Sequence, residues 1–183
     1  MAEIHPDIEQ ILLTEDEIQT KVAEMGKRIS DDYRGDDLLL VGVLKGAFVL
    51  MADIARAMTI PAEFDFMAVS SYGSSTKTSG IVRILKDLDL DIRGRKVLII
   101  EDIVDSGLTL SYLLRNLRGR EPATLDICAL MTKPDVQEVD LDIRYHGFAI
   151  PPTFVVGYGL DYRQRYRNLA YVGTLKPHIY DEG

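Results

Sequence analysis

The stretch Val97–Thr109, which reads VLIIEDIVDSGLT, decides the fold class of this chain. It begins with a run of apolar residues, 97–100, that is typical of a β-strand covered on both faces. Two adjacent acids, Glu101 and Asp102, end this run, and a turn at residues 105–107 leads into an expected helix. A strand followed by a turn and a helix is the unit from which α/β folds with parallel sheets are built.

The turn after this strand combines groups that suit a sugar phosphate. Charged side chains at the end of an apolar strand are costly unless a ligand, a metal ion or an ion pair takes them. The turn offers hydroxyls from Ser106 and Thr109, a glycine that allows close backbone approach, and free N–H groups at a helix N-terminus, which together suit a phosphate. Helix capping by Asp105 and Ser106 would explain one acid and one hydroxyl, but it would leave Glu101 and Asp102 unexplained.

Strands and helices alternate on both sides of this stretch. A capping box at Thr14–Glu17 opens an amphipathic helix that should end near Gly35. Further helices are expected over residues 47–58 and 108–117, and strands over residues 38–43, 62–69, 81–85, 96–100, 125–131, 154–156 and 169–172. This alternation predicts an α/β fold with a mostly parallel central sheet flanked by helices, in which ligands bind at the carboxyl ends of the strands.

Residues 70–80 differ from the rest of the chain. They contain five serines, two threonines and two glycines, and they show no periodicity. A loop of this length without secondary structure is typically either functional or disordered. We therefore expect a long mobile loop here.

Length and composition restrict the function classes. The chain has 183 residues, a net charge of −8 and a single cysteine, Cys128, so no intramolecular disulfide can form. A single domain over residues 1–183 is expected at this length. No apolar run reaches the roughly 20 residues of a membrane helix, the N-terminus lacks a signal peptide's features, and the surplus of acids opposes nucleic-acid binding. We therefore expect a cytoplasmic protein with neither a membrane nor a nucleic-acid partner.

The stretch Val97–Thr109 resembles the phosphoribosyl pyrophosphate signature of the type I phosphoribosyltransferases. Its Glu–Asp pair resembles the 6-oxopurine branch of that family, the hypoxanthine-guanine enzymes. Further segments resemble, in the family's order, the pyrophosphate loop (Leu44–Gly46), the lid (Ser71–Tyr72), the base-reading lysine (Lys133), the base-stacking and metal segment (154–162) and a pyrophosphate arginine (Arg167). The resemblance implies a type I phosphoribosyltransferase fold: a parallel sheet with a small hood from the N- and C-terminal parts, and a lid at about residues 70–80.

The resemblance assigns most of these residues to the phosphoribosyl donor and its magnesium. Glu101 and Asp102 would bind the ribose hydroxyls and Mg²⁺, which prefers one or two carboxylates plus substrate oxygens. The 5′-phosphate would be wrapped by Asp105, Ser106, Gly107, Leu108 and Thr109. Leu108 departs from relatives that carry Lys there, so phosphate binding would depend more on backbone amides. The pyrophosphate would meet Lys45, Gly46 and Arg167, and Asp161 would complete a second Mg²⁺ site. In this family the peptide bond at 44–45 can be cis.

The remaining residues would act on the purine. Asp105 would take or share the proton of N7 while N9 attacks the ribose carbon. Lys133 would donate to the 6-oxo group, which favours hypoxanthine or guanine over adenine because lysine has donors only. The base would also meet the ring of Phe154 and the backbone of Val155, and the lid would add Ser71 and Tyr72. An ordinary core position is the alternative reading of Phe154.

The resemblance implies purine salvage, in which the 5-phosphoribosyl group moves from its pyrophosphate to N9 of a 6-oxopurine and yields IMP or GMP and pyrophosphate, in a homodimer or homotetramer. Two alternatives stay open. One bacterial branch of the fold regulates by binding RNA, and the interleaved arginines and tyrosines of residues 161–167 would suit RNA, although that branch usually carries two Asp at positions 101 and 102. A paralogue that prefers xanthine is equally compatible with Lys133.

Overall fold

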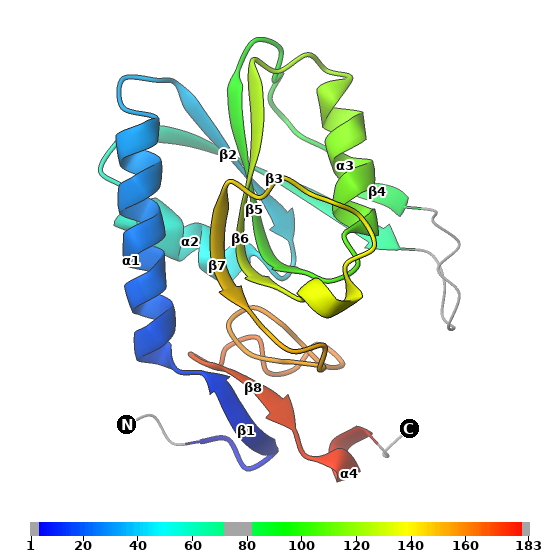
Figure 1. Cartoon of the computed structure of the whole chain (residues 1–183). Coiled ribbons are helices and arrows are strands. Elements are labelled where there is room, and N and C mark those ends of the chain that lie inside the picture. Colours follow the sequence, from blue (N-terminus) through cyan, green and yellow to red (C-terminus); the bar gives the residue numbers. More distant parts are fainter. Residues whose placement is uncertain (1–3, 72–81, 181–183) are drawn as a thin grey trace.

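A computed structural model describes residues 4–71 and 82–180, with the backbone alone at Ser71 (Figure 1). Its centre is a six-stranded sheet of order β4-β3-β2-β5-β6-β7. The strands are β2 (Leu38–Leu44), β3 (Ala62–Ser71), β4 (Val82–Lys86), β5 (Lys96–Val104), β6 (Thr124–Thr132) and β7 (Tyr145–Ala149). All neighbours are parallel except β4, which runs antiparallel to β3. The predicted α/β fold with a mostly parallel sheet is confirmed.

Helices cover both faces of this sheet, which explains why its central strands are apolar on both sides (Figure 1). On one face, helices α1 (Glu15–Asp32) and α2 (Phe48–Ala57) pack against alternate residues such as Leu40 and Leu98. On the other face, helix α3 (Leu108–Arg118) packs against the intervening residues, such as Val41 and Ile99. Each central strand is therefore fixed in register by two cores.

The capping box predicted at Thr14 is present and opens α1. The Thr14 hydroxyl accepts the Glu17 N–H at 3.3 Å, and the Glu17 carboxylate accepts the Thr14 N–H at 2.8 Å. The helix ends at Asp32, close to the predicted Gly35, whose φ of +82° no helix accommodates. Local sequence chemistry thus sets both ends of this helix.

A small antiparallel sheet lies beyond the carboxyl ends of the parallel strands and forms a hood over them (Figure 1). It pairs β1 (Ile8–Leu13) with β8 (Val172–Leu175), which come from opposite ends of the chain, and a short helix, α4 (Pro177–Tyr180), follows. The hood has its own apolar core, which includes Ile8, Val156 and Leu175. The predicted small hood is confirmed.

Several predicted elements differ in the structure. Residues 154–156 form no strand but one isolated bridge at Val156, and the strand expected over residues 169–172 lies at 172–175 instead. Strands β1 and β7 and helix α4 were not predicted, because all three are short, and the partner of β1 lies at the opposite end of the chain. Strand β3 includes Ser70 and the backbone of Ser71, which were expected to begin the loop; the rest of the expected loop lies outside the described residues, which omit 72–81. In the described part of the chain, no helix is long and apolar enough to cross a membrane.

Candidate active site

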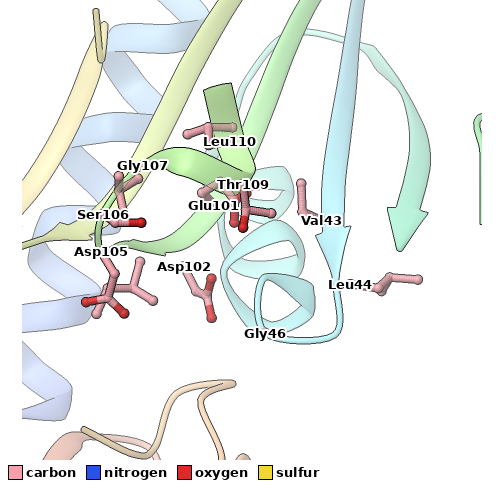
Figure 2. A pocket seen from close by; sticks show the side chains of 12 residues that line it. Val43, Leu44, Gly46, Glu101, Asp102, Asp105, Ser106, Gly107, Thr109 and Leu110 are labelled. Atoms are coloured by element: carbon pink, nitrogen blue, oxygen red, sulfur yellow. The ribbon is translucent and has the colours of Figure 1, made fainter. Parts of the chain in front are cut away.

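The two adjacent acids lie within strand β5 and not after it. The strand continues to Val104, and Glu101 pairs with Ala129 of β6. Glu101 is only 9% exposed and Asp102 only 7%. They line a pocket of about 250 Å³ at the carboxyl end of the sheet, together with Gly46, Asp105, Ser106, Gly107 and Thr109 (Figure 2). Burial of two neighbouring carboxylates is costly, so their position indicates a functional site.

The electrostatics of this acidic pair follow from burial. Burial, and then the charge of Asp102, raise the pKa of Glu101 well above its usual value. Burial also raises the pKa of Asp102, from 3.8 to about 6, and the nearby Asp105 adds to this rise. Backbone N–H groups at residues 102 and 103 and the charge of Arg167 act in the opposite direction. A cation beside the pair would offset the cost of burying the two carboxylates in their charged forms.

This burial predicts a pH-dependent stability. The folded protein binds the Asp102 proton more tightly than the unfolded chain does, so the free energy of unfolding falls as the pH rises from about 4 to about 6. The substitution Asp102→Asn should therefore stabilise the metal-free protein by about 3 kcal/mol above pH 6 and by little at pH 4. Denaturant unfolding in EDTA at both pH values measures this difference, with the exposed Asp140→Asn as control. Equal stabilisation at both pH values would contradict the assigned cause.

The turn after β5 presents backbone to the pocket. Helix α3 begins at Leu108, and its N-cap is Gly107, whose φ of +81° favours glycine. Gly107 has no side chain that could cap the helix. Instead, Ser106 Oγ accepts the backbone N–H of Leu108 at 3.3 Å. Capping thus involves Ser106 but not Asp105, and Ser106, Gly107 and Thr109 at the start of α3 line the pocket.

Asp105 instead pairs with the predicted base-reading lysine. Lys133 follows the carboxyl end of β6, and its Nζ lies 2.7 Å from Asp105 Oδ1. The lysine side chain is only 10% exposed, whereas that of Asp105 is 56% exposed. The backbone N–H of Lys133 also donates to the Val104 carbonyl at 3.0 Å. Two neighbouring strand ends therefore bring a buried cation and an accessible carboxylate together.

The loop after β2 lies against the acidic pair. The Leu44–Lys45 peptide is cis, the form that the resemblance allowed. A Cβ on Gly46 would lie 1.9 Å from Asp102 Oδ2, so a larger residue at this position would force the loop or the acid to move. Lys45 does not line the pocket, and its Nζ donates to Gln164 Oε1 at 3.3 Å. Leu44 and Gly46 line the pocket together with Asp102 (Figure 2).

The segment before β8 supplies the arginine and the third predicted acid. Arg167 pairs with Asp161 at 2.9 Å and donates to the Gly159 carbonyl at 2.7 Å and to Gln164 Oε1 at 3.1 Å. Gln164 was not predicted, yet its carbonyl oxygen joins Lys45 and Arg167, the two cations expected at the pyrophosphate. A glutamine carries no distinctive sequence signal, so only the fold could reveal this contact.

Some predicted residues lie apart from this pocket. Phe154 is 48% exposed and not a core residue, whereas Val155 is buried. Neither they nor Leu108, Lys133, Asp161 and Arg167 line the pocket of the acidic pair. Tyr72 and the side chain of Ser71 lie outside the described residues, so their roles stay predictions. Within residues 4–71 and 82–180, no group of three His, Cys, Asp or Glu side chains gathers as a ready-made metal site.

Comparison with known proteins agrees with this geometry. The model of the phosphoribosyl transferase domain matches residues 10–163. The hypoxanthine-guanine phosphoribosyltransferase of Mycobacterium avium is 58% identical over 99% of this chain and 93% of that protein, and the enzyme of the same name from Bacillus subtilis is 51% identical over 96% and 97%. A crystal structure of a hypoxanthine phosphoribosyltransferase from Staphylococcus aureus superposes with a TM-score of 0.93, at 44% identity and 98% coverage of both chains. The chain therefore belongs to the phosphoribosyltransferase family.

Proposed function

We propose that this enzyme transfers the 5-phosphoribosyl group from phosphoribosyl pyrophosphate to N9 of hypoxanthine or guanine, which yields IMP or GMP and pyrophosphate. The observation that carries the proposal is the contact between Lys133 and Asp105 at the rim of the acidic pocket. It joins a donor suited to a 6-oxo group and a base suited to N7 beside a sugar-phosphate site. The names of the most similar relatives support the same reaction.

The donor would span the pocket. The N–H groups at the start of α3 and the hydroxyls of Ser106 and Thr109 would hold the 5′-phosphate, and Glu101 and Asp102 would hold the ribose hydroxyls. Lys45 and Arg167 would neutralise the pyrophosphate, and the Gly46 backbone would lie beside it. Glycine at position 46 keeps this wall close to the acids.

The reaction exchanges one bond for another. Purine N9 forms a bond to C1′ of the ribose while the bond from C1′ to the pyrophosphate oxygen breaks, and the pyrophosphate leaves with that electron pair. The purine gives up a proton, which Asp105 takes or shares at N7. Lys133 would donate to O6 of the same base, because O6 and N7 lie on the same edge of the purine and the two side chains are in contact.

The acidic pair fits a magnesium ion. Its two carboxylates are buried and hold their protons unusually tightly, and Mg²⁺ prefers one or two carboxylates plus substrate oxygens. We propose Glu101 and Asp102 as ligands of one Mg²⁺, and Asp161, which now pairs with Arg167, as a ligand of a second. When bound, the ion would offset the negative charge on the ribosyl donor and on the departing pyrophosphate.

We propose a cytoplasmic homodimer or homotetramer, and light scattering coupled to gel filtration distinguishes these states. One structural neighbour, from Trypanosoma cruzi, comes from work on the role of its C-terminal region in oligomeric state and enzymatic activity.

The substitution Lys133→Ala tests how the base is selected. Loss of the donor to O6 should lower kcat/KM for hypoxanthine by about tenfold or more, because an unmatched buried polar group costs about 1–3 kcal/mol. Adenine, which offers no acceptor at that position, should lose less. Mass spectrometry of the nucleotides formed from each base gives the ratio, and Lys27→Ala on the exposed face of α1 is the control. An unaltered preference for hypoxanthine over adenine would remove Lys133 from base recognition.

A further inference from the structure

Three aromatic rings form a closed cluster where the hood meets the end of the chain. Phe154, Tyr162 and Tyr180 contact each other in pairs, with ring centroids 5.5–6.0 Å apart. The planes of each pair are inclined by 70–84°, so every contact is edge-to-face. This arrangement is the favoured geometry of aromatic pairs, because the positive edge of one ring meets the negative face of another. The chain segments before and after β8 therefore meet at Phe154.

The backbone at Phe154 is fixed, whereas its ring is not held by the protein core. The next two residues are buried, and Val156 exchanges backbone hydrogen bonds with Gly173 at 2.9 and 3.0 Å. Phe154 is 48% exposed. Among the described residues, its ring contacts the aromatic rings of Tyr162 and Tyr180. These two tyrosines therefore limit the rotation of the ring about its side-chain bonds.

Tyr180 is itself anchored to the hood. Helix α4 follows β8 directly, and the Lys176 N–H donates to the Asp7 carbonyl at 2.9 Å. Ile179, the neighbour of Tyr180, packs against the hood core and donates its N–H to the Lys176 carbonyl at 3.0 Å. Helix α4 thus brings the Tyr180 ring into edge-to-face contact with the Phe154 ring.

We propose that Tyr180 is a positioning residue for the purine base, which acts by holding the ring of Phe154 in one orientation with the help of Tyr162. The proposal depends on the function proposed above, in which Phe154 stacks on the base. A ring that is already oriented loses less side-chain freedom when the base binds, and preorganisation of this kind raises affinity without a new contact to the ligand. Tyr180 would therefore affect binding of the base and not binding of the ribosyl donor.

The substitution Tyr180→Ala tests this role. We expect the KM for hypoxanthine to rise about three- to tenfold, which corresponds to one lost aromatic pair. The kcat and the KM for phosphoribosyl pyrophosphate should stay within about twofold, since the donor site lies at α3 and β5. Tyr180→Phe keeps the ring and should behave as the unchanged enzyme, whereas Tyr180→Leu keeps bulk without a ring and should resemble Tyr180→Ala. Equal rises in both KM values would show a general disturbance of the hood and would overturn the proposal.

A double-mutant cycle with Phe154→Ala separates positioning from independent contributions. If Tyr180 acts through Phe154, Tyr180→Ala should add no further rise in the KM for hypoxanthine once Phe154 is alanine. Effects that multiply would overturn the proposal. The unchanged enzyme reports on the proposed function separately, because absence of IMP formation there would reject the function. A fully active enzyme whose KM for hypoxanthine is insensitive to Phe154→Ala would reject only the stacking role and, with it, that of Tyr180.

Discussion

Replacement of Asp105 by asparagine is expected to lower kcat by about two to four orders of magnitude, the range that a positioned general base contributes. Asparagine keeps the shape of the side chain and a carbonyl oxygen for Lys133 Nζ, which lies 2.7 Å from the present carboxylate. It removes the ability to accept a proton from the purine. Binding of phosphoribosyl pyrophosphate should largely survive, because the N–H groups of the turn remain.

Steady-state kinetics with hypoxanthine and calorimetric titration of the donor separate these two effects of Asp105→Asn. A suitable control is Asp135→Asn, which removes the same charge from an exposed position two residues after Lys133. Unchanged turnover would remove Asp105 from the chemistry. A matching loss of donor affinity would indicate that Asp105 serves the phosphate and not the base.

The substitution Gly46→Ala is expected to lower kcat/KM for phosphoribosyl pyrophosphate by about 10²-fold, the effect of a misplacement of roughly 1 Å at a reacting centre. The added Cβ would lie 1.9 Å from Asp102 Oδ2 and 2.7 Å from its Cγ. Asp102 lines the pocket, so either its carboxylate must turn or residues 44–46 must shift away from the acidic pair. Either movement would displace a group expected to bind the ribosyl donor.

Initial rates at varied donor concentration measure this effect of Gly46→Ala. Gly119→Ala, at the end of α3, is the matched control, because that glycine has an ordinary helical φ of −61°. Thermal unfolding of both variants checks that the fold is intact. A kcat/KM equal to that of the unchanged enzyme would contradict the close packing of Gly46 against Asp102.

The stretch Val97–Thr109 allowed the strand, the acidic pair, the turn and the helix to be predicted, because each depends on neighbouring residues. The predicted end of the strand was wrong, because β5 continues through Glu101 and Asp102 to Val104. Charged residues are disfavoured within an apolar strand, and here pairing with β6 outweighs that preference, because Ile103 and Val104 of β5 still pair with Met131 and Thr132 of β6.

Features that depend on contacts between distant segments could not be predicted from the sequence. Strand β1 has no clear alternation of polar and apolar residues, and its partner β8 lies at the other end of the chain. The contact of Gln164 with Lys45 and Arg167, and that of Tyr180 with Phe154, require the hood to be folded. The resemblance to a family indicated which residues share a site, whereas only the fold shows which of them are in contact with each other.

The most direct test of the central claim is pyrophosphate release by the unchanged enzyme with phosphoribosyl pyrophosphate, Mg²⁺ and, in turn, hypoxanthine, guanine, xanthine, adenine and uracil. We expect release with hypoxanthine or guanine and little or none with adenine and uracil, because Lys133 offers the base a hydrogen-bond donor only. Release with xanthine alone would favour the xanthine-preferring alternative. Donor binding without release for any base would contradict the proposed reaction and favour the RNA-binding regulator.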